Sequence, residues 1–360
     1  MALLALSGAQ SLALLDARTG MRRGGASSSR NMPPTLAFAN VALGGFRGVL
    51  ADMLWLRAQS LQEAGRYVEL VPLAEGIAAL EPDNGEIWAY HAWNLSFNVC
   101  AMMGRPEDRW RWVLAGIDLL EKRGMRLNPN DSRSRRELAW IFLFKLGTDT
   151  DFAAGHYRAE WARMMDSYLE ENGAPPAVPS LSASELEEVF GLNPERMAEL
   201  DERFGPMDWR VPGSHAVYWA MEGLDRAPER ERLQCQRMAY QSLVQMVQRS
   251  GRIDGDPEDE SYKGALCPNT ALVDGTLAFL REVAAEHPSH GVQAALVGFL
   301  FDTIRIHARE GRSLPSRMAY DELVAKFEPG TPLPSYADAL AGNIDFSSLP
   351  WEQLRDNHRP

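Results

Sequence analysis

The segment Leu61–Trp88, LQEAGRYVELVPLAEGIAALEPDNGEIW, decides the fold class. It contains the end of one helix, a turn at Gly65, a second helix, and a break at Pro82 before a third helix. Apolar residues keep helical spacing here, and no run in the chain alternates with period two between hairpin signals. The sequence therefore predicts an all-α protein in which helices follow one another in pairs.

The same helical spacing continues beyond Pro34 to the end of the chain. Glycines stand where helices are expected to end in left-handed caps, and prolines stand between helices or in first turns. We expect helices near residues 36–64, 67–80, 85–103, 106–123, 132–146, 150–171, 184–204, 213–224, 228–250, 269–286, 289–310, 315–327 and 335–342.

Spacing within the first half points to a repeat. A unit placed at Ala51–Asn84 is 34 residues long, and Pro82 precedes Trp88 by six residues, as Pro129 precedes Arg135. This sequence pattern resembles that of the tetratricopeptide repeat family over residues 51–147. The resemblance implies a helical-hairpin array, an α-solenoid, in which first helices line a concave groove and second helices form the convex back. It is loose beyond residue 147, so we expect an irregular second half.

A second resemblance concerns three longer runs. GGFRGVLADMLWLRAQ, RELAWIFLFKLG and FGPMDWRVPGSHAVYWA resemble a group of uncharacterised bacterial repeat proteins that often carry a hydrophobic N-terminus. This resemblance implies no activity.

Breaks in composition divide the chain. We expect a mobile or anchor-like segment at 1–34, helical repeats at 35–172, a Pro/Ser-rich linker at 173–184, a second helical region with one more repeat-like pair at 185–330, and a tail at 331–360. Residues 1–15 carry no charge, but roughly 20 apolar residues are needed to span a bilayer. They are interpreted either as the end of a membrane anchor or as a frayed or packed terminus.

Composition excludes some classes of function. The net charge is -12, from 49 acidic and 37 basic residues, which argues against nucleic-acid binding. Cys100, Cys235 and Cys267 lie far apart, so neither a disulfide framework nor a zinc site is predicted. We expect a cytoplasmic or membrane-associated protein, and the sequence leaves its oligomeric state open.

Motifs with strict mechanical requirements for catalysis are missing from the sequence. It contains no GxxxxGK[ST], no GxGxxG after a strand, no HExxH and no GxSxG. His156 and Glu160 are four residues apart, which suits an ion pair or one half of a metal site, but no second half is apparent. No cofactor, metal or catalytic residue is therefore predicted. The alternative is an enzyme with a site around Asp208–Tyr218, which includes His215.

The repeat resemblance assigns faces to the first helices. Trp88, His91, Ala92 and Leu95 are expected to pack between helices, whereas Ser96 and Leu143 are expected to face the groove. The predicted partner-binding residues are Trp55, Gln59, Tyr90, Trp93, Phe97, Arg133, Arg136, Trp140 and Phe144. Aromatic side chains with arginines among them are typical of protein-binding hot spots. Internal packing of the same aromatics is the other interpretation.

These patterns favour a non-catalytic scaffold that binds a peptide or a partner protein through a helical-repeat groove. Long surfaces arise naturally from stacked repeats. Two alternatives stay open: the enzyme just described, and a structural subunit of a larger, possibly membrane-associated assembly.

Overall fold

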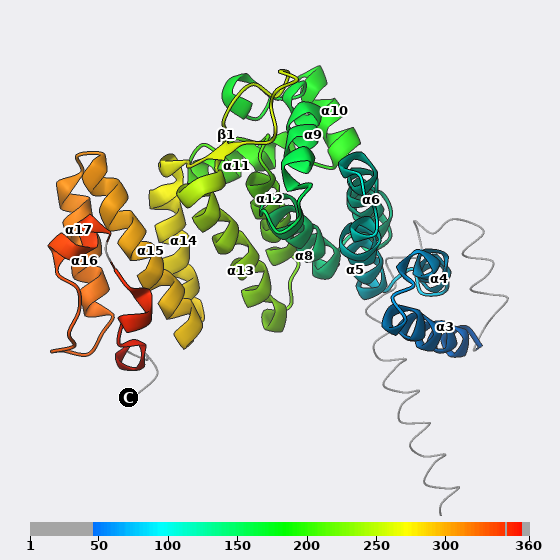
Figure 1. Ribbon diagram of the computed structural model, residues 1–360, viewed down its shortest axis with the longest axis horizontal. Coiled ribbons are helices and arrows are strands. Elements are labelled where there is room, and N and C mark those ends of the chain that lie inside the picture. Colours follow the sequence, from blue (N-terminus) through cyan, green and yellow to red (C-terminus); the bar gives the residue numbers. More distant parts are fainter. Residues whose placement is uncertain (1–45, 343, 355–360) are drawn as a thin grey trace, which may run out of the picture.

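A computed structural model describes residues 46–342 and 344–354, and these residues form an all-α protein. The helices stand side by side in an arched row that runs from α3 at one end to α17 at the other (Figure 1). The expected segment 1–34, the first ten residues of the helix expected at 36–64 and the last residues of the expected tail lie outside the described residues.

The first half contains successive helical pairs. Its elements are α3 (Phe46–Glu63), α4 (Tyr67–Leu80), α5 (Gly85–Trp93) continued by the π-helical η2 (Asn94–Val99), α6 (Pro106–Leu119) continued by the π-helical η3 (Leu120–Gly124) and α7 (Met125–Leu127), α8 (Ser132–Trp140) continued by the π-helical η4 (Ile141–Leu146), and α9 (Ala154–Asp166). Helix α3 packs against α4, and α6 packs against α5 and η2. Consecutive helices therefore pair as the sequence predicts.

The second half is also helical. Its elements are η5 (Glu171–Gly173), α10 (Leu181–Phe190), α11 (Pro194–Phe204), α12 (Pro212–Leu224), α13 (Glu229–Gln245) continued by the π-helical η6 (Met246–Ser250), β1 (Arg252–Ile253), β2 (Leu266–Cys267), η7 (Thr270–Leu272), α14 (Val273–Glu286), α15 (His290–Arg309), α16 (Ser313–Ala325), α17 (Tyr336–Ala341), η8 (Phe346–Ser348) and η9 (Trp351–Gln353). Helices α15 and α16 pack closely, as expected for the last pair.

Side-chain caps fix where α5 and α8 begin. The Asn84 side chain accepts a hydrogen bond from the Glu86 backbone N–H at 3.1 Å, and the Asp131 carboxylate accepts one from the Ser134 N–H at 2.9 Å. Each bond satisfies a donor that a helix start leaves free. The Trp88 indole donates to the Pro82 carbonyl at 2.9 Å, which links the loop before α5 to that helix.

One expectation about the helices is wrong, and one short strand pair was not anticipated. The single helix expected at 184–204 is two helices, because Gly191 adopts a left-handed φ of 62° and ends α10. Asn193 then caps α11, and Pro194 occupies its first turn. The polar break after α13 contains a short antiparallel pair in which Ile253 lies opposite Leu266.

One hydrophobic core cluster runs from Ala58 to Leu354, through helices on both sides of segment 173–184. Within it, α12 packs against both α8 and α13. Within the expected linker, Gly173 is buried and its carbonyl accepts a hydrogen bond from the Trp209 N–H at 2.9 Å. The segments before and after the expected linker therefore share a core, while the domain boundaries themselves stay a prediction.

Candidate functional site

Four aromatic side chains form a row across the first helices. Trp55 comes from α3, Tyr90 and Trp93 from α5, and Phe97 from η2. Successive ring centroids are 5.3, 6.4 and 6.0 Å apart, which are ordinary distances for interacting aromatic rings. All four side chains are half-buried. We call this set the aromatic ladder.

A hollow of about 470 Å³ lies at the Trp55 end of the ladder, between α3 and α5. Gln59 and Gln62 line it, and the Tyr90 hydroxyl donates to the Gln62 side-chain oxygen at 2.7 Å. Burial, with a smaller effect of Tyr67, raises the pKa of Tyr90, so its hydroxyl stays a donor at neutral pH. The exposed Gln59 donates to Glu63 at 3.1 Å.

The other end of the ladder borders a buried ionic cluster. The Lys145 ammonium lies 5.3 Å from the Phe97 ring centroid and 2.6 Å from the Asp151 carboxylate. Arg109 pairs with the same carboxylate at 3.0 Å. Burial alone would raise the pKa of Asp151. Hydrogen bonds from Lys145 and from the Ala153 N–H outweigh this effect, so the net result is a lowered pKa. The cluster therefore stays ionised and places a cation beside the Phe97 ring.

A further aromatic pair consists of Trp140 of α8 and Phe144 of η4, whose ring centroids are 4.0 Å apart and whose side chains are half-buried. The predicted arginines of α8 already have partners. Arg133 pairs with Glu86 of α5 at 3.2 Å and with Glu231 of α13 at 3.4 Å. Arg136 lies 3.9 Å from Glu231 and hydrogen-bonds Gln234. Both guanidinium groups thus join α8 to its neighbours.

Burial confirms the packing face predicted for the helix at 85–103. The four residues expected to pack between helices, Trp88, His91, Ala92 and Leu95, are all buried. Ser96 and Leu143 were expected on the groove side and are also buried, so that part of the prediction is wrong. Both lie in π-helical segments, η2 and η4. A π-helical turn contains more residues than an α-helical turn. Ser96 and Leu143, each three residues after a predicted groove residue, are therefore rotated away from the face that α-helical spacing predicts.

Several polar atoms beneath the ladder lack partners. The Asn98 side chain donates to the Asn94 oxygen at 3.0 Å, but the Asn94 amide nitrogen has no partner in the described part of the chain. The same is true there of the Ser96 hydroxyl and of both His91 ring nitrogens. Burial, with a smaller effect of Arg123, lowers the pKa of His91 to about 4, so its ring is neutral at pH 7.

The region around Asp208–Tyr218, the site of the enzyme alternative, is a buried junction. Arg210 pairs with Asp208 at 2.8 Å and with Asp166 at 3.1 Å. The Ser214 hydroxyl donates to the Asp208 carbonyl at 2.7 Å, so it is not directed at His215. The His215 ring nitrogen Nε2 lies 2.8 Å from the Trp209 carbonyl, and burial lowers its pKa to about 4. These groups hold α12 against its neighbours.

Residues 46–342 and 344–354 contain no group of three or more His, Cys, Asp or Glu side chains placed to hold a metal ion. His156 and Glu160 do line one hollow of about 400 Å³, together with Glu258 and Glu260. Within those same ranges, no helix is both long enough and apolar enough to cross a bilayer.

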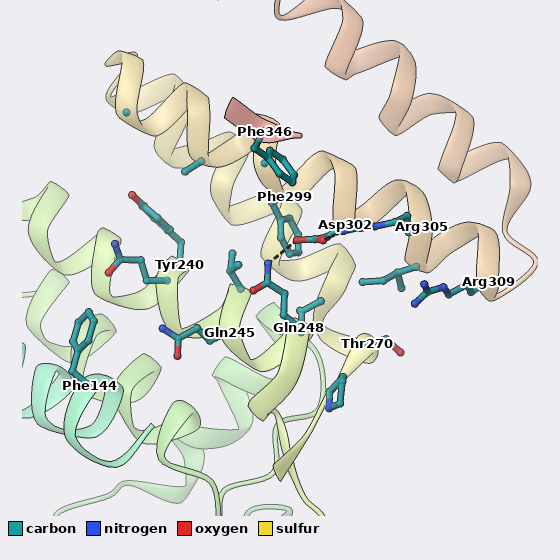
Figure 2. Close-up of a pocket in the computed structure, with 18 residues that line it drawn as sticks. Phe144, Tyr240, Gln245, Gln248, Thr270, Phe299, Asp302, Arg305, Arg309 and Phe346 are labelled. Carbon is teal, nitrogen blue, oxygen red and sulfur yellow. Dashed lines mark hydrogen bonds and ion pairs between the residues drawn. The ribbon is translucent and has the colours of Figure 1, made fainter. Parts of the chain in front are cut away.

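The sequence analysis missed a larger groove of about 1080 Å³ between two walls, α13 with η6 and α15 (Figure 2). Phe144 of the predicted set borders it. Gln241, Gln245 and Gln248 line one wall at helical spacing, and that spacing is visible in the sequence. The opposite wall comes from residues some 50 positions later, which no local pattern could bring to face them.

Comparisons with known proteins add little. No family model matches the chain, and no curated protein matches it. Solved structures similar to it include two of Nro1 from S. pombe, which is described as a nuclear import adaptor and a hypoxic regulator of sterol synthesis. One has a TM-score of 0.31 and 12% identity and covers 85% of this chain and 96% of that chain. The other has a TM-score of 0.29 and 13% identity, with coverage of 82% and 99%. At these values the likeness does not extend beyond a helical architecture.

Proposed function

We propose that the protein is a non-catalytic scaffold that binds a segment of a partner protein across the aromatic ladder. The observation that carries this proposal is the unbroken row of four half-buried rings contributed by α3, α5 and η2. Half-buried aromatic rings keep apolar surface available while their inner edges are fixed by packing. Such rings lose little conformational entropy on binding and make effective hot spots.

Polar groups at the Trp55 end of the ladder suit a peptide. Gln59 is exposed and Gln62 is half-buried there, so their amides can meet a bound segment, whereas Lys145 at the Phe97 end is buried and paired with Asp151. A segment laid along the ladder would bury apolar side chains between the rings and meet the glutamine amides at one end. This is the arrangement expected of an interface with an apolar centre and a polar rim.

The test uses peptides selected from a displayed random library against the full chain. Their affinities for the wild type and for Trp93→Ala are then measured by isothermal titration calorimetry. Because Trp93 is central in the ladder, we expect its removal to weaken binding about 30-fold, which corresponds to a hot spot of about 2 kcal/mol. The melting temperature should change little, since the side chain is half-buried.

Trp112→Ala is the matched control. Trp112 is also a half-buried tryptophan, but it lies on α6 and outside the ladder. Its replacement should leave peptide affinity unchanged. Equal losses in both variants, or a Trp93→Ala protein that binds like the wild type, would contradict the proposal.

A further inference from the structure

The groove between α13–η6 and α15 is elongated. Its α15 wall includes residues from Gly291 to Arg309, a stretch of about 27 Å along a helix. That length matches about eight residues of extended chain. In Figure 2, Phe144 lies toward one end of the groove and Arg309 toward the other, with Phe346 drawn next to Phe299 between them. The shape therefore suits a linear segment better than a compact small molecule.

One wall carries a row of amides. Gln241, Gln245 and Gln248 follow one another about one helical turn apart along α13 and η6. The Gln241 side-chain oxygen is buried and has no hydrogen-bond partner in the part of the chain that the structure describes. Buried polar atoms are nearly always paired, so this acceptor calls for a donor from outside. Rotation of the half-buried Gln241 side chain into the groove would let a peptide N–H supply this donor.

The other wall leaves room for a backbone. A Cβ atom added at Gly291 or at Gly298 would meet no other atom within 4 Å, so space lies open above both positions. Small residues let a second main chain approach a helix closely. Ile306 and Phe346 also line the groove, and Phe346 packs on Phe301 at 5.5 Å, so apolar contacts lie beside the amides.

The charge of the groove is opposite to that of the protein. Its charged lining residues are Arg305, Arg309 and Asp302, whereas the chain has a net charge of -12. Asp302 is paired with Arg305 and accepts a hydrogen bond from Gln248 at 2.7 Å. Arg309 is exposed and makes no ion pair within residues 46–342 and 344–354. One guanidinium is thus available to a carboxylate of a ligand.

We propose that this groove binds an extended, acidic peptide segment of a partner protein, as a second site separate from the aromatic ladder. The peptide backbone lies along the glutamines and above Gly298. An acidic side chain of the peptide pairs with Arg309, and an apolar side chain contacts Ile306 or Phe346.

The probe is a pool of fluorescein-labelled peptides of about ten residues. Every peptide carries one aromatic and one glutamate residue at varied spacing, and a second pool has glutamine in place of glutamate. Binding to the full chain is followed by fluorescence polarisation. We expect the acidic pool to bind at least about tenfold more tightly than the neutral pool, the effect of one charge-assisted hydrogen bond.

Two variants locate the site. Gly298→Leu fills the open space above α15 and should weaken binding of the acidic pool more than about tenfold. Gly48→Leu is its control, because Gly48 is also a helical glycine with nothing within 4 Å of its Cβ position and lies on α3. Arg309→Gln should reduce affinity for the acidic pool to that for the neutral pool. The exposed Arg111, replaced by Gln, should change neither affinity.

The outcomes separate this site from the aromatic ladder. Trp93→Ala should bind the acidic pool as the wild type does. Binding that survives Gly298→Leu in a folded protein, or that is lost in Trp93→Ala and retained in Gly298→Leu, would overturn the groove proposal. Equal binding of the acidic and neutral pools would overturn it as well, because recognition by Arg309 is part of it.

Discussion

His91 and His215 are buried imidazoles with different surroundings. His215 contacts the Trp209 carbonyl at 2.8 Å through Nε2 and stacks on Phe142 at 5.0 Å. His91 has no hydrogen-bond partner at either ring nitrogen in the described residues. For both, burial is the main cause that lowers the pKa from 6.5 to about 4. Each ring is therefore neutral in the folded protein at pH 7, although only one of them is hydrogen-bonded.

These pKa values predict that stability depends on pH. Because the folded pKa of each ring lies below 6.5, the unfolded chain binds protons first as the pH falls. The free energy of unfolding should be highest above about pH 7, fall between about 6.5 and 4, and level off below that as far as these rings are concerned. The loss is about 3 kcal/mol for each ring. Urea unfolding at a series of pH values measures it.

Leucine substitutions separate the two rings. His91→Leu removes an unpartnered buried imidazole, so its free energy of unfolding at pH 7 should match or exceed that of the wild type. His215→Leu removes a hydrogen bond and should cost about 1 to 2 kcal/mol. Each variant should lose about half of the pH dependence. A steeper pH dependence in either variant would contradict the pKa assignment.

Side-chain faces were predicted less well from the sequence where the helix changes from α to π. The predicted ladder residues Tyr90 and Trp93 lie in α5 and are half-buried, as a groove face requires. Ser96 and Leu143 lie one turn later in π-helical segments and point inward. The extra residue in a π turn leaves no reliable signal in composition, so this part of the site could not be placed in advance.

The crossing of α6 over η2 depends on one glycine. A Cβ atom at Gly116 would contact the Ser96 side chain and would lie 2.8 Å from the Ala92 carbonyl oxygen. The two helical segments therefore approach each other more closely than any side chain allows. Glycine at this helix position costs some backbone entropy, and the close packing of the pair offsets that cost.

Gly116→Ala should lower the free energy of unfolding by about 2 kcal/mol, because the added methyl group overpacks the contact with Ser96 and Ala92. Gly298→Ala is the control within α15, where the added methyl meets nothing within 4 Å. That change should raise stability by about 0.5 to 1 kcal/mol through helix propensity. Denaturant unfolding of both variants measures the contrast, and a stabilised Gly116→Ala protein would contradict the packing argument.

Helix ends were partly predictable because their signals are local. Gly65 and Gly311 end helices with positive φ, as expected. The expectation of left-handed caps is wrong for Gly104, Gly124, Gly147 and Gly251, none of which has a positive φ. The break between α10 and α11 was missed, although Gly191, Asn193 and Pro194 carry its signals in sequence. Helical spacing of apolar residues on either side outweighed them. Signals at single residues are easily masked when the flanking segments share one period.

The arrangement of distant elements rests on contacts that no local pattern contains. Arg133 and Glu231 are 98 residues apart and pair at 3.4 Å, and the Ser132 hydroxyl donates to Glu231 at 2.8 Å. Burial alone would raise the pKa of Glu231. Ser132 and Arg133 outweigh this effect, so the net result is a lowered pKa. The contact of Ser132 and Arg133 with Glu231 joins α8 to α13, and we call it the α8–α13 junction. Helices α9, α10 and α11 lie between α8 and α12 in sequence and take no part in it. Sequence spacing predicted most of the helices and could not predict which of them meet here.

Glu231→Ala should lower the free energy of unfolding by about 2 kcal/mol, since it leaves the buried Ser132 hydroxyl without its acceptor and removes the carboxylate that Arg133 and Arg136 share. Glu229→Ala is the control, because the Glu229 side chain is 84% exposed and its ion pair with Arg232 is 3.9 Å long. That variant should differ from the wild type by less than about 0.5 kcal/mol. Equal stabilities of the two variants would show that the junction contributes nothing.

The unequal reach of these contacts gives the arch unequal mechanical stiffness. Bonds between residues nearly 100 positions apart brace α8 against α13, whereas α3 packs mainly on α4, its neighbour in sequence. We therefore expect the α3–α4 end to yield before the centre when the arch is bent. The aromatic ladder crosses that boundary, with Trp55 on α3 and Tyr90, Trp93 and Phe97 on α5 and η2. Under the proposed function, a shift of α3 would move Trp55 relative to the other three rings and adjust the ladder to bound segments of different thickness.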